Sequence, residues 1–311
     1  KKLRISPVPS IIAIAISSNL QGAATLVGDT TSILLGQAVN LNFMEFFFLK
    51  GKLGIFWVVE AGALVSMLIL LWVFRKEKQE IHKMERTVVT DYFPTILLAG
   101  VVVLLILASF FPEYRIIATF ISENADITNG VICVGLMMIG LIRKYIKTKS
   151  FDTFTSASKE MDYQTLLLLG GLFLVIGGIA EAGVINEISK LFLKIGGDNV
   201  FLIYTLIVWA SVIISAFIDN IPYVMAMLPV VAEISTAMGL SNPYLLAFGL
   251  LIGATLGGNI TPIGASANIA GIGILRKDGH EVKASQFMKI SVPFTLSAVL
   301  TGYILIWLIW S

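Results

Sequence analysis

The chain has 311 residues, of which 57% are hydrophobic and only 14% are charged. Soluble domains carry about 25% charged residues, so this composition excludes an ordinary soluble domain and indicates an integral membrane protein. The 22 basic and 20 acidic residues leave a net charge of +2, which gives no reason to expect a nucleic-acid partner, and the single cysteine excludes an internal disulfide and a thiolate metal cluster.

Apolar segments of two kinds follow one another along the chain. A spanning helix needs roughly 20 mostly apolar residues. The candidate spans are 54–74, 93–111, 127–142, 163–183, 199–217 and 291–310. The shorter or interrupted apolar runs are 8–18, 25–39, 221–238, 243–256 and 260–275. Interrupted runs suit re-entrant hairpins and broken helices, whose irregular backbone must be buried in protein or line a cavity. The sequence therefore predicts an all-α integral membrane protein with broken helices.

Basic residues predict the orientation of the chain. The segments 75–91 and 143–159 each contain five lysine or arginine residues, whereas 112–126 contains only one. Loops on the cytoplasmic side carry an excess of lysine and arginine. We therefore expect a multi-pass protein of the plasma membrane, with loops 75–91 and 143–162 in the cytoplasm and 112–126 outside.

An internal repeat relates the beginning of the chain to its end. Residues 18–33 read SNLQGAATLVGDTTSI, and a shift of 236 residues aligns this stretch with TLGGNITPIGASANI at 255–269. Each copy precedes a charged segment and then a spanning helix, and the two spanning helices are predicted to run in opposite directions. Paired broken segments in halves of opposite topology are typical of the midplane binding site of a secondary transporter.

The repeat suggests how the chain is divided. The stretch SAFIDNIPYVMAMLPV at 215–230 precedes the second copy and has no counterpart before the first. We therefore expect the first repeat to be incomplete in this sequence. Residues 1–53 would be the end of the first repeat, with a hairpin arm, a broken helix and an interfacial segment. Residues 54–162 would be scaffold helices and cytoplasmic loops, and residues 163–311 the second repeat with its hairpin, broken helix and final span.

Two carboxylates stand out within the apolar segments. Asp29 lies in the first glycine-rich break, and Asp219 with Asn220 lies at the end of a predicted span. A charge at the bilayer centre costs at least about 2.5–3.5 kcal/mol on insertion scales, so each aspartate is a candidate for function. The alternative interpretation is that each aspartate caps a helix, and both roles are compatible.

Neutral oxygens and amides surround the same breaks, and hard cations such as Na⁺ prefer oxygen ligands. The alternative for any one of them is an ordinary hydrogen bond between membrane helices. As a cluster they favour an ion site, whose neutral members would be Asn19, Thr25, Thr31, Asn220, Asn259, Thr261, Ser266 and Asn268. We expect no cofactor beyond Na⁺ or H⁺ as the coupling ion, with Na⁺ held by the two aspartates.

Three motifs resemble the ion-transporter superfamily. They are GxATLxGD at 22–29, SAFxDNIP at 215–222 and GGNxTxIGASAN at 257–268. The superfamily includes arsenite permeases, NhaD-type sodium/proton antiporters, the melanosomal P protein and citrate and dicarboxylate symporters. The resemblance covers nearly the whole chain, and the second-repeat motifs are most similar to the arsenite permease and NhaD branch.

The resemblance implies an architecture and a set of roles. It implies inverted repeats, each with a re-entrant hairpin and a broken helix, a transport domain that moves in an elevator fashion, and a scaffold that forms a homodimer. It also implies that Asn19, Asp29, Thr31 and Asp219 are ion ligands or proton carriers, with the polar residues of 259–268 as their partners.

Among possible functions, sodium/proton antiport is favoured because two carboxylates can hold either ion. Neither glycine-rich break contains a lysine or arginine that would neutralise an organic dianion. Arsenite efflux stays open, since neutral arsenite could bind hydroxyls and amides, and so does sodium-coupled di- or tricarboxylate transport. An intramembrane aspartyl protease is disfavoured because the contexts LVGDTT and AFIDN lack its GxGD motif. We therefore expect a non-enzyme whose partners are the lipid bilayer and a small inorganic ion or anion.

Overall fold

A computed structural model describes residues 6–75, 91–110, 128–161 and 163–311 of the chain. Most of the described residues are helical and the two strands have only two residues each, so the prediction of an all-α membrane protein is confirmed. Most of the predicted loop 75–91 and all of the predicted loop 112–126 lie outside the described residues. The chain divides into two compact units, one of residues 1–41, 45–81 and 171–311 and one of residues 42–44 and 82–170.

The first part of the larger unit contains a broken helix and a long span. A break at residues 23–29 separates α1 (Pro7–Gly22) from α2 (Thr30–Ala38). After a single 3₁₀ turn (Met44–Phe46), strands β1 (Phe48–Leu49) and β2 (Lys52–Leu53) form a small antiparallel hairpin before α3 (Ile55–Phe74). The hairpin turns at Lys50 and Gly51, whose φ angles are 51° and 77°.

The second part of this unit begins at a sharp bend. Helix α8 (Tyr163–Glu181), which starts in the other unit, is followed by α9 (Val184–Gly196), and the two helices are bent by 69°. Gly183 lies at the bend with a φ of 75°, which glycine adopts readily because it has no Cβ atom. The helices that follow are α10 (Val200–Ser215), α11 (Asn220–Ala237), α12 (Tyr244–Gly257), α13 (Ser266–Lys277) and α14 (Ala284–Trp310).

Small residues allow α10 and α12 to pack closely. A Cβ atom on Gly253 would lie 2.5 Å from the Val208 carbonyl oxygen, and one on Gly257 would lie 2.8 Å from that of Val212. Both contacts have the same sequence offset, so the two helices run parallel. Glycines spaced by four residues let membrane helices approach at the backbone. The end of α10 is therefore brought level with the break that follows α12.

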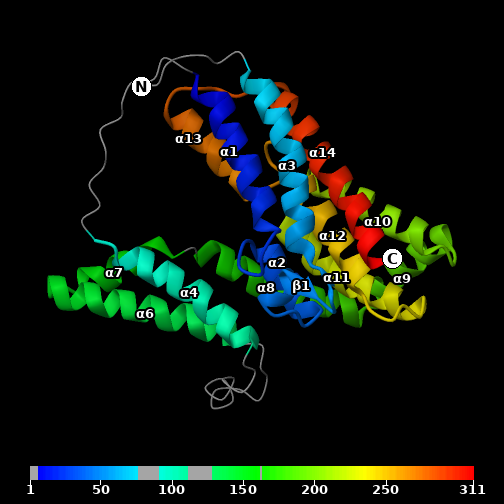
Figure 1. The fold of residues 1–311 in the computed structure, drawn as a ribbon, viewed down its shortest axis with the longest axis horizontal. Helices are drawn as coiled ribbons and strands as arrows, with labels where there is room; N and C mark the ends of the chain where they lie inside the picture. The colour runs from blue at the N-terminus through cyan, green and yellow to red at the C-terminus, as the bar shows by residue number, and fades with distance from the viewer. Residues whose placement is uncertain (1–5, 76–90, 111–127, 162) are drawn as a thin grey trace. The chain divides into compact units, whose positions relative to one another are not determined.

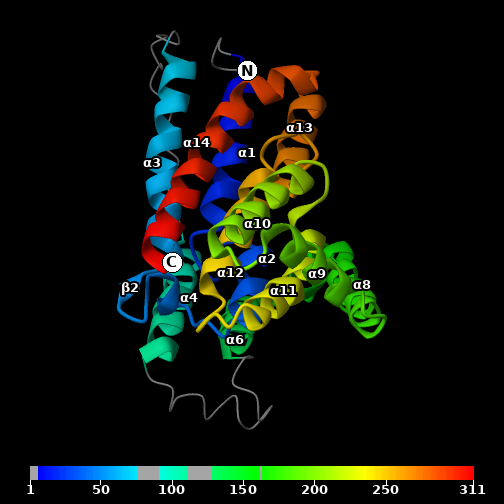
Figure 2. The ribbon, with the colours of Figure 1, turned by 90° about the vertical axis from the view of Figure 1, so that its right-hand side faces the viewer.

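The two broken helices run in opposite directions. Figures 1 and 2 show α1 beside α13, with the α1–α2 pair directed against the α12–α13 pair. Gly271 of α13 packs against Ile11 and Ala15 of α1. Helix α3 packs along α14, and a Cβ atom on Gly62 of α3 would lie 3.2 Å from the Ala298 carbonyl oxygen of α14. This antiparallel arrangement is the one that the sequence repeat predicts.

Five helices are long and apolar enough to cross a membrane, or six if the bent α8–α9 pair forms one span, among the described residues. The helix found at the predicted span 199–217 is shorter than predicted. Helix α10 has 16 residues, and the chain turns at 216–219 into α11. The predicted loop 143–162 is largely helical, since α6 continues to Thr148 and α7 follows after three residues. Helix α14 starts at Ala284 rather than at residue 291.

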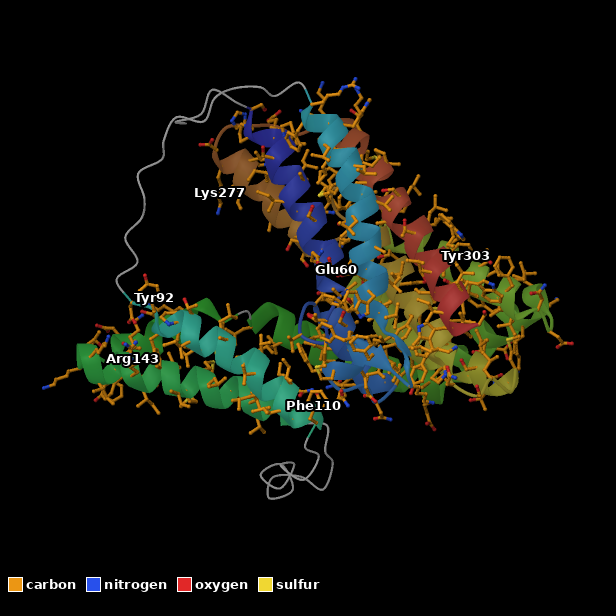
Figure 3. The ribbon with its side chains drawn as sticks, in the orientation of Figure 1. Glu60, Tyr92, Phe110, Arg143, Lys277 and Tyr303 are labelled. Carbon is orange, nitrogen blue, oxygen red and sulfur yellow. The ribbon has the colours of Figure 1, made fainter. Side chains whose placement is uncertain are left out.

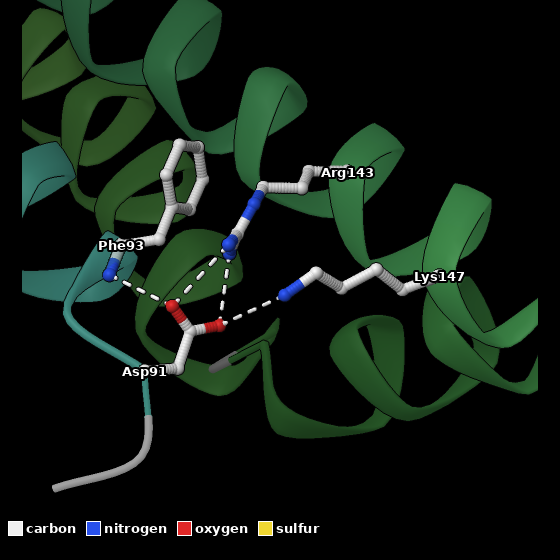
Figure 4. Close-up of polar contacts among 4 residues, drawn as sticks. All are labelled: Asp91, Phe93, Arg143 and Lys147. Atoms are coloured by element: carbon white, nitrogen blue, oxygen red, sulfur yellow. Dashed lines mark hydrogen bonds and ion pairs between the residues drawn. The ribbon is translucent and has the colours of Figure 1, made fainter.

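The smaller unit contains α4 (Phe93–Phe110), α6 (Thr128–Thr148), α7 (Asp152–Glu160) and the start of α8. Asp91 joins α4 to α6, because its carboxylate accepts hydrogen bonds from Arg143 at 2.9 Å and from the Phe93 backbone N–H at 2.9 Å (Figure 4). Lys147 lies 3.4 Å from the same carboxylate. The hydrogen bond from Arg143, followed by that from Phe93, holds the pKa of Asp91 well below its usual range. The division of the chain into repeats and scaffold stays a prediction.

Candidate functional site

Both helix breaks are closed by a pair of glycines in close contact. A Cβ atom on Gly28 would lie 2.5 Å from the Gly22 carbonyl oxygen, and a Cβ atom on Gly264 would lie 2.6 Å from the Gly258 carbonyl oxygen. No ordinary side chain tolerates a contact below 3.0 Å with backbone. The two pairs are related by the same 236-residue shift that aligns the sequences. The glycines therefore close both breaks with the same geometry.

A side chain ties each break together in the same way. The Ser32 hydroxyl donates to the Gly22 carbonyl oxygen at 3.1 Å. The Asn268 amide nitrogen donates to the Gly258 carbonyl oxygen at 3.1 Å and to the Thr261 carbonyl oxygen at 3.0 Å. Ser32 and Asn268 are again 236 residues apart. Both amide hydrogens of Asn268 are used in these bonds, and its buried Oδ1 atom accepts no hydrogen bond in the described part of the chain.

The two breaks differ in the residue that precedes the second helix. Asp29 (φ −150°, ψ 158°) and Ala265 (φ −146°, ψ 145°) have nearly the same extended backbone. The Asp29 carboxylate accepts from the Thr30 backbone N–H at 2.7 Å and so caps α2, whereas α13 has no side-chain cap. Asp29 thus combines the capping role with a position inside the break. The first break carries a charge and the second leaves a helix N-terminus open.

Amide side chains join the two broken helices where they cross. The Asn19 amide nitrogen donates to the Thr255 carbonyl oxygen at 2.6 Å and lies 3.1 Å from Asn259 Oδ1. The Asn259 amide nitrogen donates back to the Ile16 carbonyl oxygen at 3.0 Å. Asn19 and Asn259 are both buried, with 8% and 0% of their surface exposed. The Thr255 carbonyl lies in the last turn of α12, where a helix end leaves carbonyl groups without an intrahelical partner, so the bond from Asn19 satisfies it.

Hydroxyl groups extend this network to Asp29. The Thr31 hydroxyl donates to Asp29 Oδ2 at 3.0 Å and lies 3.0 Å from the Thr255 hydroxyl. Thr31 and Thr255 are fully buried. A hydroxyl group has a single proton, so when Thr31 donates to Asp29 the Thr255 hydroxyl must donate to Thr31. The charge of Asp29 is therefore connected through one hydroxyl to the second broken helix.

The turn between α10 and α11 closes the site from a third direction. The Thr261 hydroxyl donates to the Ala216 carbonyl oxygen, and the Ser215 hydroxyl donates to the Ala254 carbonyl oxygen at 2.6 Å. A Cβ atom on Gly264 would lie 2.8 Å from the carbonyl oxygens of both Ser215 and Ala216. The second break and this turn are therefore held in contact by backbone as well as side-chain groups.

The second carboxylate of the site follows this turn. Asp219 caps α11 by accepting from the Ile221 backbone N–H at 3.1 Å, and Asn220 is buried beside it with 3% of its surface exposed. Asp219 and Asp29 are both half-buried and close enough for their charges to interact. In the described part of the chain, neither carboxylate is paired with a lysine or arginine. Each carboxylate can hold a proton or attract a cation.

The predicted site residues are thus distributed over three connected groups. Asn19, Asp29, Thr31 and Asn259 form one hydrogen-bonded network. Thr261 and Asn268 hold the second break, and Asp219 and Asn220 begin α11. Among the described residues, the side chains of half-buried Thr25 and exposed Ser266 make no hydrogen bond. Their roles as ion ligands stay a prediction.

Two contributors to the network were absent from the predicted site. Thr255 contributes a carbonyl oxygen and a hydroxyl group to it, and Ser32 ties the first break. The sequence repeat contains the signal for both, because Thr255 aligns with Asn19 and Ser32 aligns with Asn268. A polar residue that aligns with a predicted ligand is therefore a candidate in its own right.

Comparison with known proteins gives one family and several relatives. The profile of the CitMHS family, described as "Citrate transporter", matches residues 1–253. The "46 kDa membrane protein" of Mycobacterium leprae is 28% identical over 313 residues, which cover 99% of this chain and 69% of that protein. An "Uncharacterized transporter" of Synechocystis sp. is 24% identical over 327 residues, covering 100% of this chain and 70% of the relative. The "P protein" of Homo sapiens is 33% identical over 150 residues, 46% of this chain and 18% of that protein.

Proposed function

The chain belongs to the CitMHS family of citrate transporters, and from this premise we propose that it is a secondary active transporter coupled to H⁺ or Na⁺ through Asp29 and Asp219. The mode that we propose first is exchange of Na⁺ for H⁺. The observation that carries this proposal is that two half-buried carboxylates, at the starts of α2 and α11, have no basic partner in the described part of the chain.

The chemistry of exchange follows from competition for the same oxygens. A hard cation is bound by carboxylate, carbonyl and amide oxygens, and protonation of a carboxylate removes the charge that attracts it. The Thr31 hydroxyl supports either state, because it can donate to a carboxylate and can rotate to accept from a carboxylic acid. Binding of one ion then releases the other.

Alternating access would require the broken elements to move together. The hydrogen bonds of Asn19 and of Thr261 join the first break, the second break and the α10–α11 turn into one body. Such a body could move in an elevator fashion against a scaffold, and that scaffold would hold two copies in a homodimer of the plasma membrane. Midplane sites on discontinuous helices are typical of secondary transporters.

Proteoliposomes with an internal pH dye test the proposal. With an acidic lumen, external Na⁺ should cause alkalinisation, and Asp29→Asn and Asp219→Asn should each abolish it. Asp91→Asn serves as the control, since this carboxylate pairs with Arg143 in the other compact unit and should leave the flux unchanged. Absence of cation-dependent proton flux in the unaltered protein would contradict exchange of Na⁺ for H⁺.

Symport of a carboxylate is the second candidate function. The first turn of α13 has no side-chain cap, and Ser266 at its start is exposed. Backbone N–H groups at a helix N-terminus attract anions. The family description also favours citrate as a substrate. Uptake of radiolabelled citrate that depends on an inward proton or sodium gradient would support this function over exchange. Ser266→Ala should then raise KM, while citrate uptake unaffected by Ser266→Ala and by both aspartate variants would contradict it.

A further inference from the structure

A buried tyrosine lies one helical turn after the second candidate carboxylate. Tyr223 is four residues beyond Asp219, in the first turn of α11, and its backbone N–H lies 3.5 Å from the Asp219 carbonyl oxygen. Its side chain is 8% exposed, and a buried phenol hydroxyl usually has a hydrogen-bond partner. Tyr223 and Asp219 belong to one turn of helix, so a displacement of the tyrosine also displaces the carboxylate.

The Tyr223 hydroxyl is paired with α10. Its oxygen lies 3.1 Å from the Ser211 hydroxyl oxygen, which in turn lies 2.6 Å from the Ile207 carbonyl oxygen. A carbonyl oxygen can only accept, so the single Ser211 proton goes to Ile207 and Tyr223 must donate to Ser211. Among the described residues, this is the only side-chain hydrogen bond between α10 and α11. The tyrosine therefore ties the two arms of the hairpin together.

Helix α10 is itself fixed to the second break. Its last residue, Ser215, donates to a carbonyl oxygen of α12 at 2.6 Å, and the next residue, Ala216, accepts from the Thr261 hydroxyl. Ser211 lies one turn before Ser215, at the same end of α10. The bond from Tyr223 therefore connects α11 to a helix end that is already held against the second break.

Asp219 has no such connection of its own. Its carboxylate accepts from the Ile221 backbone N–H at 3.1 Å, and among the described residues no side chain of another helix donates to it. The bond to Ile221 lies within α11 and moves with it. The other side-chain bonds from α11 to a neighbouring helix are those of Glu233 to α9, 14 residues from Asp219. The position of Asp219 relative to the second break therefore depends on the bond between Tyr223 and Ser211.

We propose that Tyr223 is a positioning residue for ion binding, whose hydroxyl acts through Ser211 to hold the Asp219 carboxylate in its binding position beside the second break. This inference rests on the proposed exchange of Na⁺ for H⁺ and adds a residue that does not touch the ion. Without the bond, α11 populates positions in which Asp219 is displaced, and the apparent affinity for Na⁺ falls with the fraction of protein that is competent to bind. Saturating Na⁺ restores the binding position, so the maximal rate is kept.

Proton flux in proteoliposomes over a range of Na⁺ concentrations tests this role. Tyr223→Phe keeps the ring and removes the hydroxyl. It should raise the Na⁺ concentration for half-maximal flux about fivefold, the effect of one hydrogen bond, with little change in the maximal rate. Ser211→Ala should have the same effect, and the double variant should show no further shift, because both changes remove one bond. A role in folding alone would instead lower the maximal rate and leave the half-maximal concentration unchanged.

Tyr303 of α14, labelled in Figure 3, offers a matched control. Its hydroxyl lies 2.7 Å from the Thr205 hydroxyl, whose proton goes to the Phe201 carbonyl oxygen at 2.7 Å. The same kind of bond therefore joins α14 to α10, nearer the start of α10 and away from the hairpin turn. Tyr303→Phe should leave the half-maximal Na⁺ concentration unchanged. Thermal unfolding should place Tyr223→Phe and Tyr303→Phe within a few degrees of each other, which excludes a general loss of the fold in either variant.

The flux measurements distinguish failure of this role from failure of the proposed function. Cation-dependent flux in the unaltered protein, with the same half-maximal Na⁺ concentration in Tyr223→Phe, would overturn the positioning role alone. An equal shift in Tyr223→Phe and Tyr303→Phe would also overturn it, because the effect would then follow the loss of any hydroxyl bond to α10. Absence of cation-dependent flux in the unaltered protein would contradict exchange of Na⁺ for H⁺ and, with it, this role of Tyr223.

Discussion

Asn19 is the side chain that joins the two broken helices most directly. Its amide contacts a carbonyl oxygen and an amide oxygen of the second break, and both contacts are buried. Serine, threonine and asparagine often bridge membrane helices for stability alone. At Asn19 the bridge also sets the distance between the break that contains Asp29 and the break that contains Asn259.

Asn19→Ala and Asn259→Ala should therefore be coupled. Each change leaves buried hydrogen-bond partners of the removed side chain unsatisfied. The free energy of unfolding should therefore fall by about 1–3 kcal/mol, and the unfolding temperature should fall with it. The double variant should be less destabilised than the sum, with a coupling energy of about 1 kcal/mol. Thermal unfolding in detergent measures all three variants, and strictly additive effects would show that the 3.1 Å contact contributes nothing.

Asp29→Asn should separate stability from transport. Asparagine caps helices about as well as aspartate, so the bond to the Thr30 N–H can be kept and the unfolding temperature should change little. Ion coupling should be lost, because the neutral amide neither exchanges a proton near neutral pH nor attracts a cation by charge. Proteoliposome flux and thermal unfolding of the same preparation check this prediction. A variant that transports normally would assign to Asp29 a capping role alone.

The helix breaks require glycine at positions that include Gly28 and Gly264. Gly28→Ala and Gly264→Ala would each place a Cβ atom within 2.6 Å of a backbone oxygen. Overpacking of this kind costs about 1–3 kcal/mol, and we expect each variant to lower both stability and transport. Gly273→Ala is the matched control on α13, since nothing lies within 4 Å of its Cβ position and alanine favours the helix. Equal effects at all three positions would contradict the repeated break geometry.

The contact between α4 and α6 should depend on pH. The hydrogen bond from Arg143 lowers the pKa of Asp91 in the folded state, so the stabilisation is complete above the unfolded pKa of about 3.9 and is lost as pH falls through the lower folded value. The unaltered protein should therefore unfold at a higher temperature than Asp91→Asn at pH 7, and this difference should shrink below about pH 4. A difference that grows on acidification would contradict this assignment.

The sequence predicts the helical elements better than their ends. Apolar runs indicate α1 and α12 within a few residues, because this signal is local. The predicted runs 25–39 and 260–275 contain α2 and most of α13 but begin inside the breaks that precede them. The predicted span 199–217 locates α10, although the helix ends earlier than predicted. The helix α9 after the bend was not predicted, because its sequence mixes charged and apolar residues and forms no long apolar run. The β1–β2 hairpin was also missed, as two-residue strands leave almost no pattern.

The candidate site was predictable in part, because the internal repeat is a sequence signal. A shift of 236 residues aligns the two breaks, and the closing contacts of Gly28 and Gly264 follow that alignment. The cross-links did not follow from it: no sequence pattern indicates that Asn19 reaches Thr255, because that contact depends on how two helices cross. The repeat locates the elements of the site, and packing selects which of its side chains meet.

Considered as a whole, the larger compact unit gathers all the elements that the ion-binding proposal requires. Its two antiparallel broken helices meet the α10–α11 turn, and each of these three elements contributes polar groups to the same region. Asp29 and Asp219 bring two negative charges into it without a basic partner in the described part of the chain. The account therefore depends on one property of the protein, which is competition between a proton and a cation at these carboxylates.

Proton release on sodium binding measures that competition directly. Na⁺ would be added to the detergent-solubilised protein in weakly buffered solution near neutral pH, and the protons released per bound Na⁺ would be counted with a pH indicator. The account predicts release in the unaltered protein and in Asp91→Asn, and none in Asp29→Asn or Asp219→Asn. Sodium binding without proton release, or release that persists in both aspartate variants, would contradict it.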